Sequence, residues 1–367
     1  MSDRADRRYG KSILLVFENK RNTDFKTAQT VVENLAAYGY YFDKVSRVAF
    51  SQTEEIVRAL GDGLENYENL VLLCPAKMGR TLSDFVVQRT GAEFDNFGVS
   101  SNGNQHVFMI YYDRESRLRY ADIKAVLDKK YGVKYDSTVI RIVCAPKQLI
   151  DDAVIAAKSV FVDGNVYFNI KDDFDDCRIE VVYSSETPKM LLDEGLREIV
   201  KRLNDYIYAM EDISLAEQLY RLLKLRRMKI AVAESFTGGG VGKKLVEVPG
   251  VSEVFFEGIN TYSNQSKMQR LGVSELTLNQ RGAVSAETAY QMAEGLLKTG
   301  NCDVAISTTG IAGPKSDNTS KPVGLAYIGV GIGSDVAVYK FNFNGDRERI
   351  TKTAINHALF LAYKRLK

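Results

Sequence analysis

Residues 228–246 read M-K-I-A-V-A-E-S-F-T-G-G-G-V-G-K-K-L-V. The apolar residues at the start of this stretch predict a buried strand, and the glycines predict a tight turn that leads into a helix over residues 241–246. Such a turn presents a hydroxyl group and several backbone N–H groups at the positive end of the helix. Ser235 therefore lies where a nucleophile would lie, and the N–H groups of the turn lie where an oxyanion or a phosphate would be held. A plain glycine turn with a capping serine is the alternative interpretation.

Length and composition limit the class of protein. A chain of 367 residues predicts two or three domains, and 45% hydrophobic with 26% charged residues is typical of soluble globular proteins. The 49 basic and 47 acidic residues give a net charge of +2, which lacks the strongly basic balance of a nucleic-acid-binding protein. No stretch has the length of a membrane span, and the first residues lack the apolar core of a signal peptide. We therefore expect a cytoplasmic protein that binds neither nucleic acids nor membranes.

The numbers of cysteines and histidines limit the kinds of catalytic and metal-binding site that the chain can form. The four cysteines are scattered and form no C-x-x-C pair, which argues against a disulfide framework and against a zinc site. The two histidines, His106 and His357, fit structural roles at a strand end and in the last helix. A Ser–His–Asp triad and a histidine metal centre are therefore disfavoured. A hydroxyl nucleophile in this chain needs a different base, and lysine is the usual substitute.

The order of strands and helices indicates an α/β protein of three domains. Up to residue 136, strands alternate with helices, which predicts an α/β/α layered domain. Residues 137–210 predict a small α+β connector domain with strands over 138–143, 165–170 and 178–183 and helices over 147–157 and 188–203. Residues 211–367 predict a second α/β/α domain. Its expected strands cover residues 228–232, 254–261, 304–308, 325–331 and 335–343, and its expected helices cover 215–225, 241–246, 264–271, 286–298 and 348–364.

Three polar loops in the third domain follow predicted strands. The first is the turn at Ser235, the second is T-Y-S-N-Q-S-K at residues 261–267, and the third is S-T-T-G-I-A-G-P at residues 307–314. Ligands of α/β sheets bind outside the carboxyl ends of the strands. We therefore expect the three loops to form one site.

The second loop contains a candidate base. Tyr262 leaves the strand and Lys267 lies about one turn into the following helix, so both side chains could point back to the sheet edge. A lysine acts as a base only if burial or a nearby cation lowers its pKa from about 10.4. Tyr262 could then relay a proton or orient the lysine. The alternative is a solvated Lys267 and a core aromatic Tyr262.

The third loop is a candidate ligand cradle. Gly310 and Gly313 allow close approach of the backbone, and Thr309 can donate or accept a hydrogen bond. Such a loop suits a phosphate or an amide carbonyl, and a plain turn is the alternative.

The motif F-N-G-D-R places an arginine at the start of the last helix. Arg347 could pair with an anionic ligand. A surface salt bridge with Asp346 or Glu348 is an equally good interpretation.

The motifs together resemble one known family. The strings A-E-S-F-T-G-G-G, Y-S-N-Q-S-K-M-Q-R-L-G-V, G-A-V-S, T-T-G-I-A-G-P, K-P-V-G and G-D-R, in this order between residues 214 and 367, resemble the C-terminal domain of the CinA family. That domain is a nicotinamide-nucleotide amidase. The remainder of the chain resembles the family's N-terminal domain, of the molybdopterin-binding MoaB/MogA type, followed by a small connector.

The resemblance implies hydrolysis of nicotinamide mononucleotide to nicotinate mononucleotide and ammonia, a reaction of pyridine-nucleotide salvage without a cofactor or metal. It implies that Ser235 is the nucleophile, Lys267 the base and Tyr262 its partner, and we expect a homodimer. We expect the substrate to contact Thr237, Gly238, Gly239, Thr309, Gly310, Gly313 and Arg347. On this hypothesis the N–H groups of the glycine turn hold the oxyanion, while Lys267 and Tyr262 carry the proton to ammonia.

The chain departs from the family pattern at several places. Phe236 stands where the family often has cysteine, and the loop over residues 315–320, K-S-D-N-T-S, stands where the family tends to have glycines. In the first domain, the loop over residues 17–25 has no glycine, and the loop over residues 74–84 keeps three family residues, Gly79, Thr81 and Asp84. We therefore expect this domain to be a structural or oligomerising remnant.

Two alternatives to the amidase stay open. The first is a nucleotide-binding regulatory protein without turnover, because a binding pocket can be retained after catalytic activity is lost. The second is residual metal-dependent ADP-ribose pyrophosphatase activity in the first domain, although the glycines that would admit a phosphate are missing there.

Overall fold

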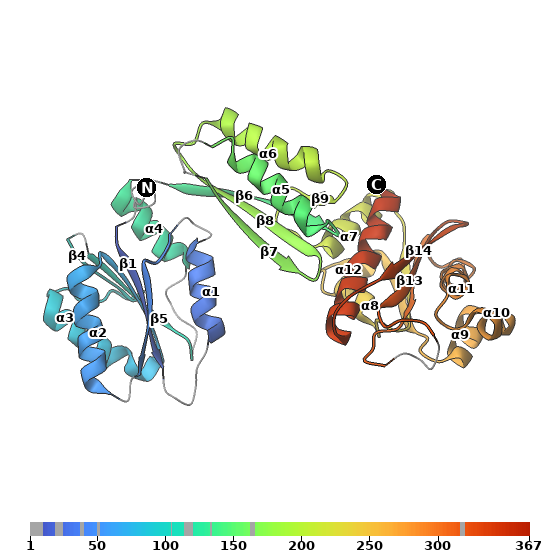
Figure 1. Cartoon of the computed structure of the whole chain (residues 1–367), viewed down its shortest axis with the longest axis horizontal. Coiled ribbons are helices and arrows are strands. Elements are labelled where there is room, and N and C mark those ends of the chain that lie inside the picture. Colours follow the sequence, from blue (N-terminus) through green and yellow to red (C-terminus); the bar gives the residue numbers. More distant parts are fainter. Residues whose placement is uncertain are drawn as a thin grey trace. The chain divides into compact units, whose positions relative to one another are not determined.

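The chain forms two compact units, which are drawn in the computed structural model of Figure 1. The structure describes residues 10–18, 25–36, 40–49, 52–103, 105–113, 120–132, 134–161, 166–315 and 320–367. The first unit comprises Met1–Thr138, Ala156–Asn169 and Glu180–Arg197, and the second comprises Val139–Ile155, Ile170–Ile179 and Glu198–Lys367. The α/β class is confirmed, whereas the boundaries of three domains stay a prediction.

The first unit contains a five-stranded sheet in the order β2-β1-β3-β5-β4. Its pairs are parallel except for β4, which runs antiparallel to β5. The strands are β1 (Ser12–Glu18), β2 (Lys44–Ala49), β3 (Asn69–Cys74), β4 (Val99–Asn102) and β5 (Gln105–Tyr111), and the helices are α1 (Phe25–Ala36), α2 (Thr53–Asn66), α3 (Gly79–Thr90) and α4 (Tyr120–Tyr131). Strand β4 was not predicted from the sequence, since the four residues V-S-S-N carry little alternation of apolar and polar side chains.

Alternate residues of β1 pack on opposite faces of this sheet. Leu14 and Val16 belong to a core with α1 and α4, whereas Ile13 and Leu15 belong to a core with α2 and α3. Figure 1 shows α2 and α3 on one side of the strands and α1 on the other. This arrangement is the expected α/β/α layering.

The middle of the chain forms a four-stranded sheet in the order β7-β8-β6-β9. Its elements are β6 (Tyr135–Val143), α5 (Lys147–Lys158), β7 (Val166–Asp173), β8 (Asp176–Ser184), α6 (Lys189–Leu203) and β9 (Ile207–Ala209). The short β9 follows the helix that the sequence predicts over residues 188–203, in a stretch where no strand was expected. Three residues are too few to give a strand pattern in the sequence.

The second unit contains the sheet that carries the three polar loops, in the order β11-β10-β12-β13-β14. The strands are β10 (Ile230–Glu234), β11 (Phe255–Asn260), β12 (Val304–Gly310), β13 (Leu325–Ile332) and β14 (Asp335–Asn342). The helices are α7 (Leu215–Arg226), α8 (Gly240–Val246), α9 (Asn264–Leu271), α10 (Glu275–Arg281), α11 (Ala286–Leu297) and α12 (Arg347–Leu366). Strand β10 pairs in parallel with β11 and β12, so the ends of these three strands lie at one edge.

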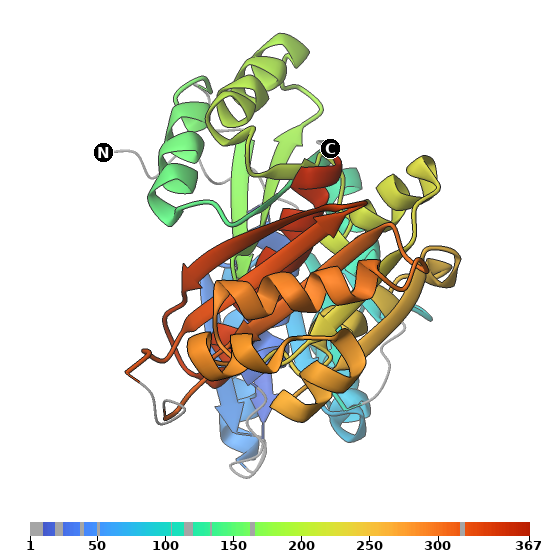
Figure 2. The same ribbon diagram turned by 90° about the vertical axis from the view of Figure 1, so that its right-hand side faces the viewer.

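Helices cover both faces of this sheet. Val232 of β10 packs with α7, α8 and α12, whereas Ala231 and Ala233 pack with α9 and α11. Figure 2 shows α9, α10 and α11, in orange, in front of the strands. Helix α10 was not predicted, although Ser274 is a residue type that caps helices: its hydroxyl oxygen accepts a hydrogen bond from the Thr277 N–H.

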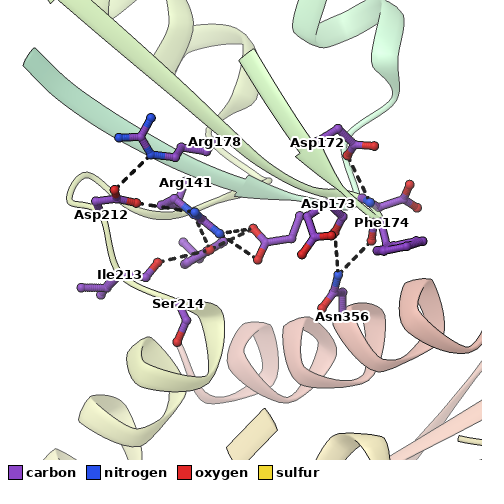
Figure 3. Close-up of polar contacts among 12 residues, drawn as sticks. Arg141, Asp172, Asp173, Phe174, Arg178, Asp212, Ile213, Ser214 and Asn356 are labelled. Carbon is purple, nitrogen blue, oxygen red and sulfur yellow. Dashed lines mark hydrogen bonds and ion pairs between the residues drawn. The ribbon is translucent and has the colours of Figure 1, made fainter. Parts of the chain in front are cut away.

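The tip of the β7–β8 hairpin is bound to α12 (Figure 3). The buried Asn356 side chain donates hydrogen bonds to the backbone oxygens of Asp173, at 3.1 Å, and Phe174, at 2.9 Å. Next to it, the Asp175 carboxylate lies 3.2 Å from Nε2 of His357, and this hydrogen bond lowers the pKa of Asp175. The histidine therefore has the structural role that the sequence predicted.

A second polar cluster in Figure 3 joins β6, β8 and β9. Arg141 donates two hydrogen bonds of 2.9 Å to the Asp176 carboxylate and one of 2.8 Å to the Tyr208 hydroxyl oxygen. The Tyr208 hydroxyl donates in turn to Asp176 at 2.9 Å. Arg178 adds an ion pair of 3.0 Å with Asp212, just before α7. The polar groups of this cluster are thus paired with one another.

We predict that Asn356→Ala lowers the free energy of unfolding by about 1–3 kcal/mol, because two backbone oxygens lose their donor. Urea denaturation of the full chain measures this change. Asn301→Ala, at an exposed position, is the control, and its effect should stay below about 0.5 kcal/mol. Equal effects of the two substitutions would contradict the role of the Asn356 hydrogen bonds.

Candidate active site

The structure brings Ser235 and Lys267 together, although they are 32 positions apart in the chain. Ser235 follows β10 and is held there by a 3.0 Å hydrogen bond from its N–H to the Thr308 backbone oxygen. Helix α9 begins after its cap, Ser263, and Lys267 lies about one turn into it. The lysine side chain returns to the sheet edge, and its Nζ lies 3.0 Å from Ser235 Oγ.

The Lys267 amine has three oxygen neighbours. Nζ lies 3.0 Å from Ser235 Oγ, 2.7 Å from the backbone oxygen of Thr261 and 3.3 Å from that of Tyr262. A neutral amine has two hydrogens and one lone pair. With its two hydrogens on the two carbonyl oxygens, the lone pair points at the serine hydroxyl. This is the arrangement of a general base.

Burial lowers the pKa of Lys267, as its use as a general base requires. The Lys267 residue is 1% exposed, and burial lowers the pKa of its amine to about 8. Desolvation disfavours the charged form, and no other cause contributes to the shift. The alternative of a solvated surface lysine is therefore wrong.

Tyr262 contacts Lys267 through its backbone and not, as the sequence predicted, through its side chain. The hydrogen bond between them is made by the backbone oxygen of Tyr262, and the tyrosine residue is 69% exposed. A core aromatic role is therefore wrong as well. Because a backbone oxygen is present in every residue type, the contact says nothing about the phenol.

Glu234, which the sequence analysis did not single out, organises the glycine turn. Its buried carboxylate accepts hydrogen bonds from the Thr237 hydroxyl at 2.7 Å and from the N–H groups of Gly239, Val241 and Gly242 at 3.0, 3.1 and 2.8 Å. The signal that could have revealed it was an acidic residue directly before a turn that opens a helix.

This carboxylate changes the expected roles of the glycines. The Gly239 N–H is bound to Glu234, and the Gly238 N–H donates to the Ser235 backbone oxygen at 3.2 Å. In this state neither group is available to the oxyanion or phosphate that the sequence placed there. Among the described residues, the N–H groups of Phe236 and Thr237 have no hydrogen-bond acceptor.

Thr309 lies beside Ser235 at the end of β12. Glu234 pairs with Thr308 in the parallel ladder, so the next residues, Ser235 and Thr309, are neighbours across the two strands. The buried Thr309 hydroxyl donates to the Ala283 backbone oxygen at 2.7 Å. This hydroxyl therefore fixes the segment before α11 in the structure as it stands.

The two loop glycines have packing roles. A Cβ atom at Gly310 would lie 2.9 Å from the Leu325 backbone oxygen, and one at Gly313 would lie 2.8 Å from Val323 Cγ1. Gly313 also has a φ of 85°, a conformation that favours glycine. The neighbouring segment over 320–325 therefore explains both glycines without a bound ligand. Residues 316–319, where the family tends to have glycines, lie outside the described residues.

Arg347 contacts the third loop. Its Nη1 donates a 2.7 Å hydrogen bond to the Gly313 backbone oxygen. The alternative prediction, an ion pair of Arg347 with Asp346 or Glu348, is wrong. Asp346 instead accepts a hydrogen bond from the Arg349 N–H, and Glu348 forms an ion pair with Lys352. The arginine thus ties the start of α12 to the third loop.

The loop over residues 74–84 of the first unit, where the chain keeps three residues of the family pattern, is explained by packing. Residues 74–84 run from the end of β3 through a short 3-10 helix, η1 (Ala76–Met78), into α3. Gly79 lies against the Tyr111 side chain, where a Cβ atom would collide with the ring. Close packing therefore explains this glycine. Residues 19–24, in the first loop, lie outside the described residues.

The described part of the chain lacks two further kinds of feature, a metal cluster and a membrane-spanning helix. There, no group of three or more His, Cys, Asp or Glu side chains could hold a metal ion. No helix of these residues has the length and apolar character to cross a membrane.

Comparison with known proteins identifies relatives of the second unit. Residues 212–366 match the family model described as the CinA C-terminal domain. The chain is 48% identical over 183 residues to a protein of Caldicellulosiruptor saccharolyticus named "Putative competence-damage inducible protein", covering 50% of this chain and 44% of the relative. A Clostridium beijerinckii protein of the same name is 47% identical over 174 residues, covering 47% and 42%. The chain therefore spans less than half the length of these curated relatives.

Two solved structures are also similar. The competence/damage inducible protein CihA from Agrobacterium tumefaciens is 34% identical and covers 41% of this chain and 93% of its own, with a TM-score of 0.40. The competence damage-inducible protein A from Klebsiella pneumoniae is 28% identical and covers 41% and 94%, with a TM-score of 0.41.

We predict that Lys267→Met changes stability in a pH-dependent way. The lysine pKa is about 10.4 in the unfolded chain and about 8 in the fold, so the wild type gains stability as the pH rises from 8 towards 10. The variant lacks this gain. Its free energy of unfolding relative to wild type should therefore be higher at pH 7 than at pH 10, by roughly 1–3 kcal/mol.

Urea denaturation at the two pH values measures this difference. Lys298→Met, which replaces an exposed lysine at the end of α11, is the control and should behave alike at both. A pH-independent difference for Lys267→Met would show that the folded protein does not depress the lysine pKa.

Proposed function

We propose that this chain, which belongs to the CinA family through its residues 212–366, is an amidase in which Ser235 is the nucleophile and Lys267 its base. The observation that carries the proposal is the 3.0 Å contact between Lys267 Nζ and Ser235 Oγ, together with the burial of the lysine. A hydroxyl becomes a nucleophile when an adjacent base accepts its proton, and a lysine with a pKa near 8 is such a base at neutral pH.

The proposed substrate is nicotinamide mononucleotide, because the motifs around these residues resemble those of nicotinamide-nucleotide amidases. In the first step, Lys267 accepts the proton of Ser235 while Oγ forms a bond to the carboxamide carbon. The C–N bond then breaks, Lys267 gives the proton to the leaving nitrogen, and ammonia departs. An ester between Ser235 and the nicotinate group remains.

In the second step, water cleaves this ester. Lys267 accepts a proton from the water, whose oxygen bonds to the acyl carbon, and the ester C–O bond breaks. The proton returns to Ser235 Oγ, and nicotinate mononucleotide leaves. The overall balance is one amide and one water consumed, with one carboxylic acid and one ammonia produced. The cycle needs neither a metal nor a cofactor.

The proposed donors to the oxyanion are the N–H groups of Phe236 and Thr237. They come directly after the nucleophile and have no acceptor among the described residues. Donors that are already in place cost no reorganisation when charge develops on the carbonyl oxygen. Glu234 supports this role because its hydrogen bonds fix the turn in which the donors lie.

The proposed contact for the phosphate is Arg347. Its guanidinium group has five N–H donors, and the structure gives a bond of one nitrogen to the Gly313 oxygen. The group can therefore hold the loop and an anion together. Thr309, Gly310 and Gly313 would then shape the wall of the site. A cytoplasmic location and a homodimer remain predictions from the sequence.

A regulatory protein without turnover is the second candidate, since the names of the relatives refer to competence and damage. A binding protein has no use for a buried lysine next to a serine hydroxyl, which favours the amidase. Calorimetry with nicotinamide mononucleotide, without ammonia release, would favour binding alone. Assays with ADP-ribose and divalent metal ions test the pyrophosphatase alternative in the first unit.

We predict that the wild type releases ammonia from nicotinamide mononucleotide in the presence of EDTA. Ser235→Ala should lower kcat by at least about 1000-fold, because the acyl step loses its nucleophile. The ratio kcat/KM should rise with pH to a plateau above about pH 8, as Lys267 becomes neutral. Ser252→Ala, at an exposed position, is the control. Equal rates for Ser235→Ala and wild type would exclude the serine mechanism.

We also predict that Tyr262→Phe keeps more than about half of the wild-type kcat, because the backbone oxygen that contacts Lys267 is retained. The measurement is steady-state ammonia release, with Tyr290→Phe on α11 as the control. A loss greater than about tenfold, specific to Tyr262→Phe, would instead assign proton transfer to the phenol.

A further inference from the structure

Three residues with hydroxyl groups lie side by side at the ends of β11, β10 and β12. Glu234 pairs with Asn260 and with Thr308, and the hydrogen bonds from Thr261 N to Glu234 O and from Ser235 N to Thr308 O extend both ladders by one residue. The next residues, Thr261, Ser235 and Thr309, therefore form a row. Neighbouring strands lie about 4.8 Å apart, so each member of the row adjoins the next.

The side chains of the row face α9 and α11. Ala233 and Ile259 pack in the core that includes Met268 of α9 and Met292 of α11. Side chains two residues apart on a strand share a face, so Ser235 and Thr261 continue on this face. Lys267 reaches Ser235 from the same side.

One member of the row differs from the other two. The hydroxyl groups of Ser235 and Thr309 have hydrogen-bond partners at 3.0 and 2.7 Å. Thr261 is 0% exposed, and its Oγ1 has no hydrogen-bond partner among the described residues. An unpaired buried hydroxyl is costly, and native structures rarely keep one without a reason.

We propose that Thr261 is a positioning residue whose hydroxyl group donates a hydrogen bond to Ser235 Oγ when Lys267 is neutral. The inference rests on the proposed function of Ser235 and Lys267 and adds a third side chain to them. In this proposal the Thr261 side chain turns about χ1, so that its hydroxyl group points along the row towards Ser235.

The protonation state of Lys267 changes how strongly Ser235 Oγ can accept a hydrogen bond from Thr261. When Lys267 is charged, its third hydrogen occupies Ser235 Oγ. When it is neutral, the serine donates to the lysine, so both lone pairs of Ser235 Oγ are open to Thr261 and the polarised hydroxyl is a stronger acceptor. As the serine proton moves to Lys267, negative charge grows on Oγ and strengthens this bond. The bond weakens again when Oγ becomes an ester oxygen.

Burial is the cause of the lowered lysine pKa, and no charged group around Lys267 adds to it. Glu234 precedes Ser235 on β10 and so points to the opposite face, where the turn binds its carboxylate. The other ionisable side chains on the elements around Lys267 are Tyr262 before α9, Arg270 on α9, Glu257 on β11, and Glu287, Tyr290 and Glu294 on α11. Glu287 and Glu294 are paired with Arg281 and Lys298.

The experiment compares Thr261→Val with wild type and with Thr261→Ser. Phenylmethylsulfonyl fluoride modifies activated serines, so its rate of reaction with Ser235 as a function of pH reports the protonation of Lys267 without any amide substrate. Thermal denaturation gives Tm, and ammonia release gives kcat and KM.

Because the hydrogen bond is stronger with neutral Lys267, it lowers the lysine pKa, and its loss should move the midpoint of modification to higher pH. For Thr261→Val we expect a shift of about half a pH unit or more, a fall in kcat of roughly 3- to 10-fold and a KM within about twofold. Tm should be equal to or above that of wild type, since a methyl group replaces an unpaired hydroxyl. Thr261→Ser should keep the wild-type midpoint.

Thr288→Val is the matched control. The Thr288 hydroxyl is equally buried but donates to the Gly282 oxygen at 2.8 Å. This substitution should lower Tm by several degrees and leave the midpoint in place. A Thr261→Val variant that behaved in the same way would overturn the proposal, because its hydroxyl would then be structural.

The outcomes distinguish a failure of the Thr261 proposal from a failure of the proposed amidase function. If the serine is modified with the expected pH dependence but nicotinamide mononucleotide is not hydrolysed, the substrate assignment fails, and the Thr261 comparison still decides the inference. A wild type in which Ser235 is not modified at any pH would overturn both.

Discussion

The parallel pairing of β10 with β11 on one side and β12 on the other is the constraint on which the site depends. Because all three strands run in the same direction, their carboxyl ends meet at one edge and three loops converge there. Ser235 is thereby placed between Thr261 and Thr309, and α9 follows β11 closely enough for Lys267 to reach back to the serine. A change in the order of the strands would separate these groups.

Strand geometry also keeps the Glu234 carboxylate away from the Lys267 amine. Glu234 and Ser235 are consecutive, so their side chains point to opposite faces of the sheet. The carboxylate is stabilised by N–H groups of the turn on the α8 side, while the lysine on the α9 side is surrounded by neutral oxygens. A carboxylate beside Lys267 would have stabilised the ammonium form and removed its basicity. Separation by the sheet lets one segment of sequence hold a buried negative charge and a neutral base.

Close packing accounts for several residues that a motif alone would assign to ligand binding. Gly310 is required by the approach of the Leu325 carbonyl oxygen, and Gly79 by the Tyr111 ring. The Gly239 N–H is bound to Glu234. A glycine-rich sequence shows that the backbone approaches something closely. Whether that is a ligand or the protein itself depends on neighbours from distant parts of the chain.

The sequence by itself determined the α/β class, most strands and helices of the C-terminal sheet, and the pairing of Ser235 with Lys267. These follow from local periodicity, from the shortage of histidine and from motifs that resemble the CinA family. Tertiary structure alone decided that Lys267 is buried with no counter-charge among the described residues, that Tyr262 contributes a backbone oxygen, and that the Glu234 carboxylate accepts hydrogen bonds from the N–H groups of the turn. It also decided that the Thr261 hydroxyl has no hydrogen-bond partner within the described part of the chain. The reason is physical: burial and hydrogen-bond partners depend on residues brought together from different strands, which a one-dimensional pattern does not contain.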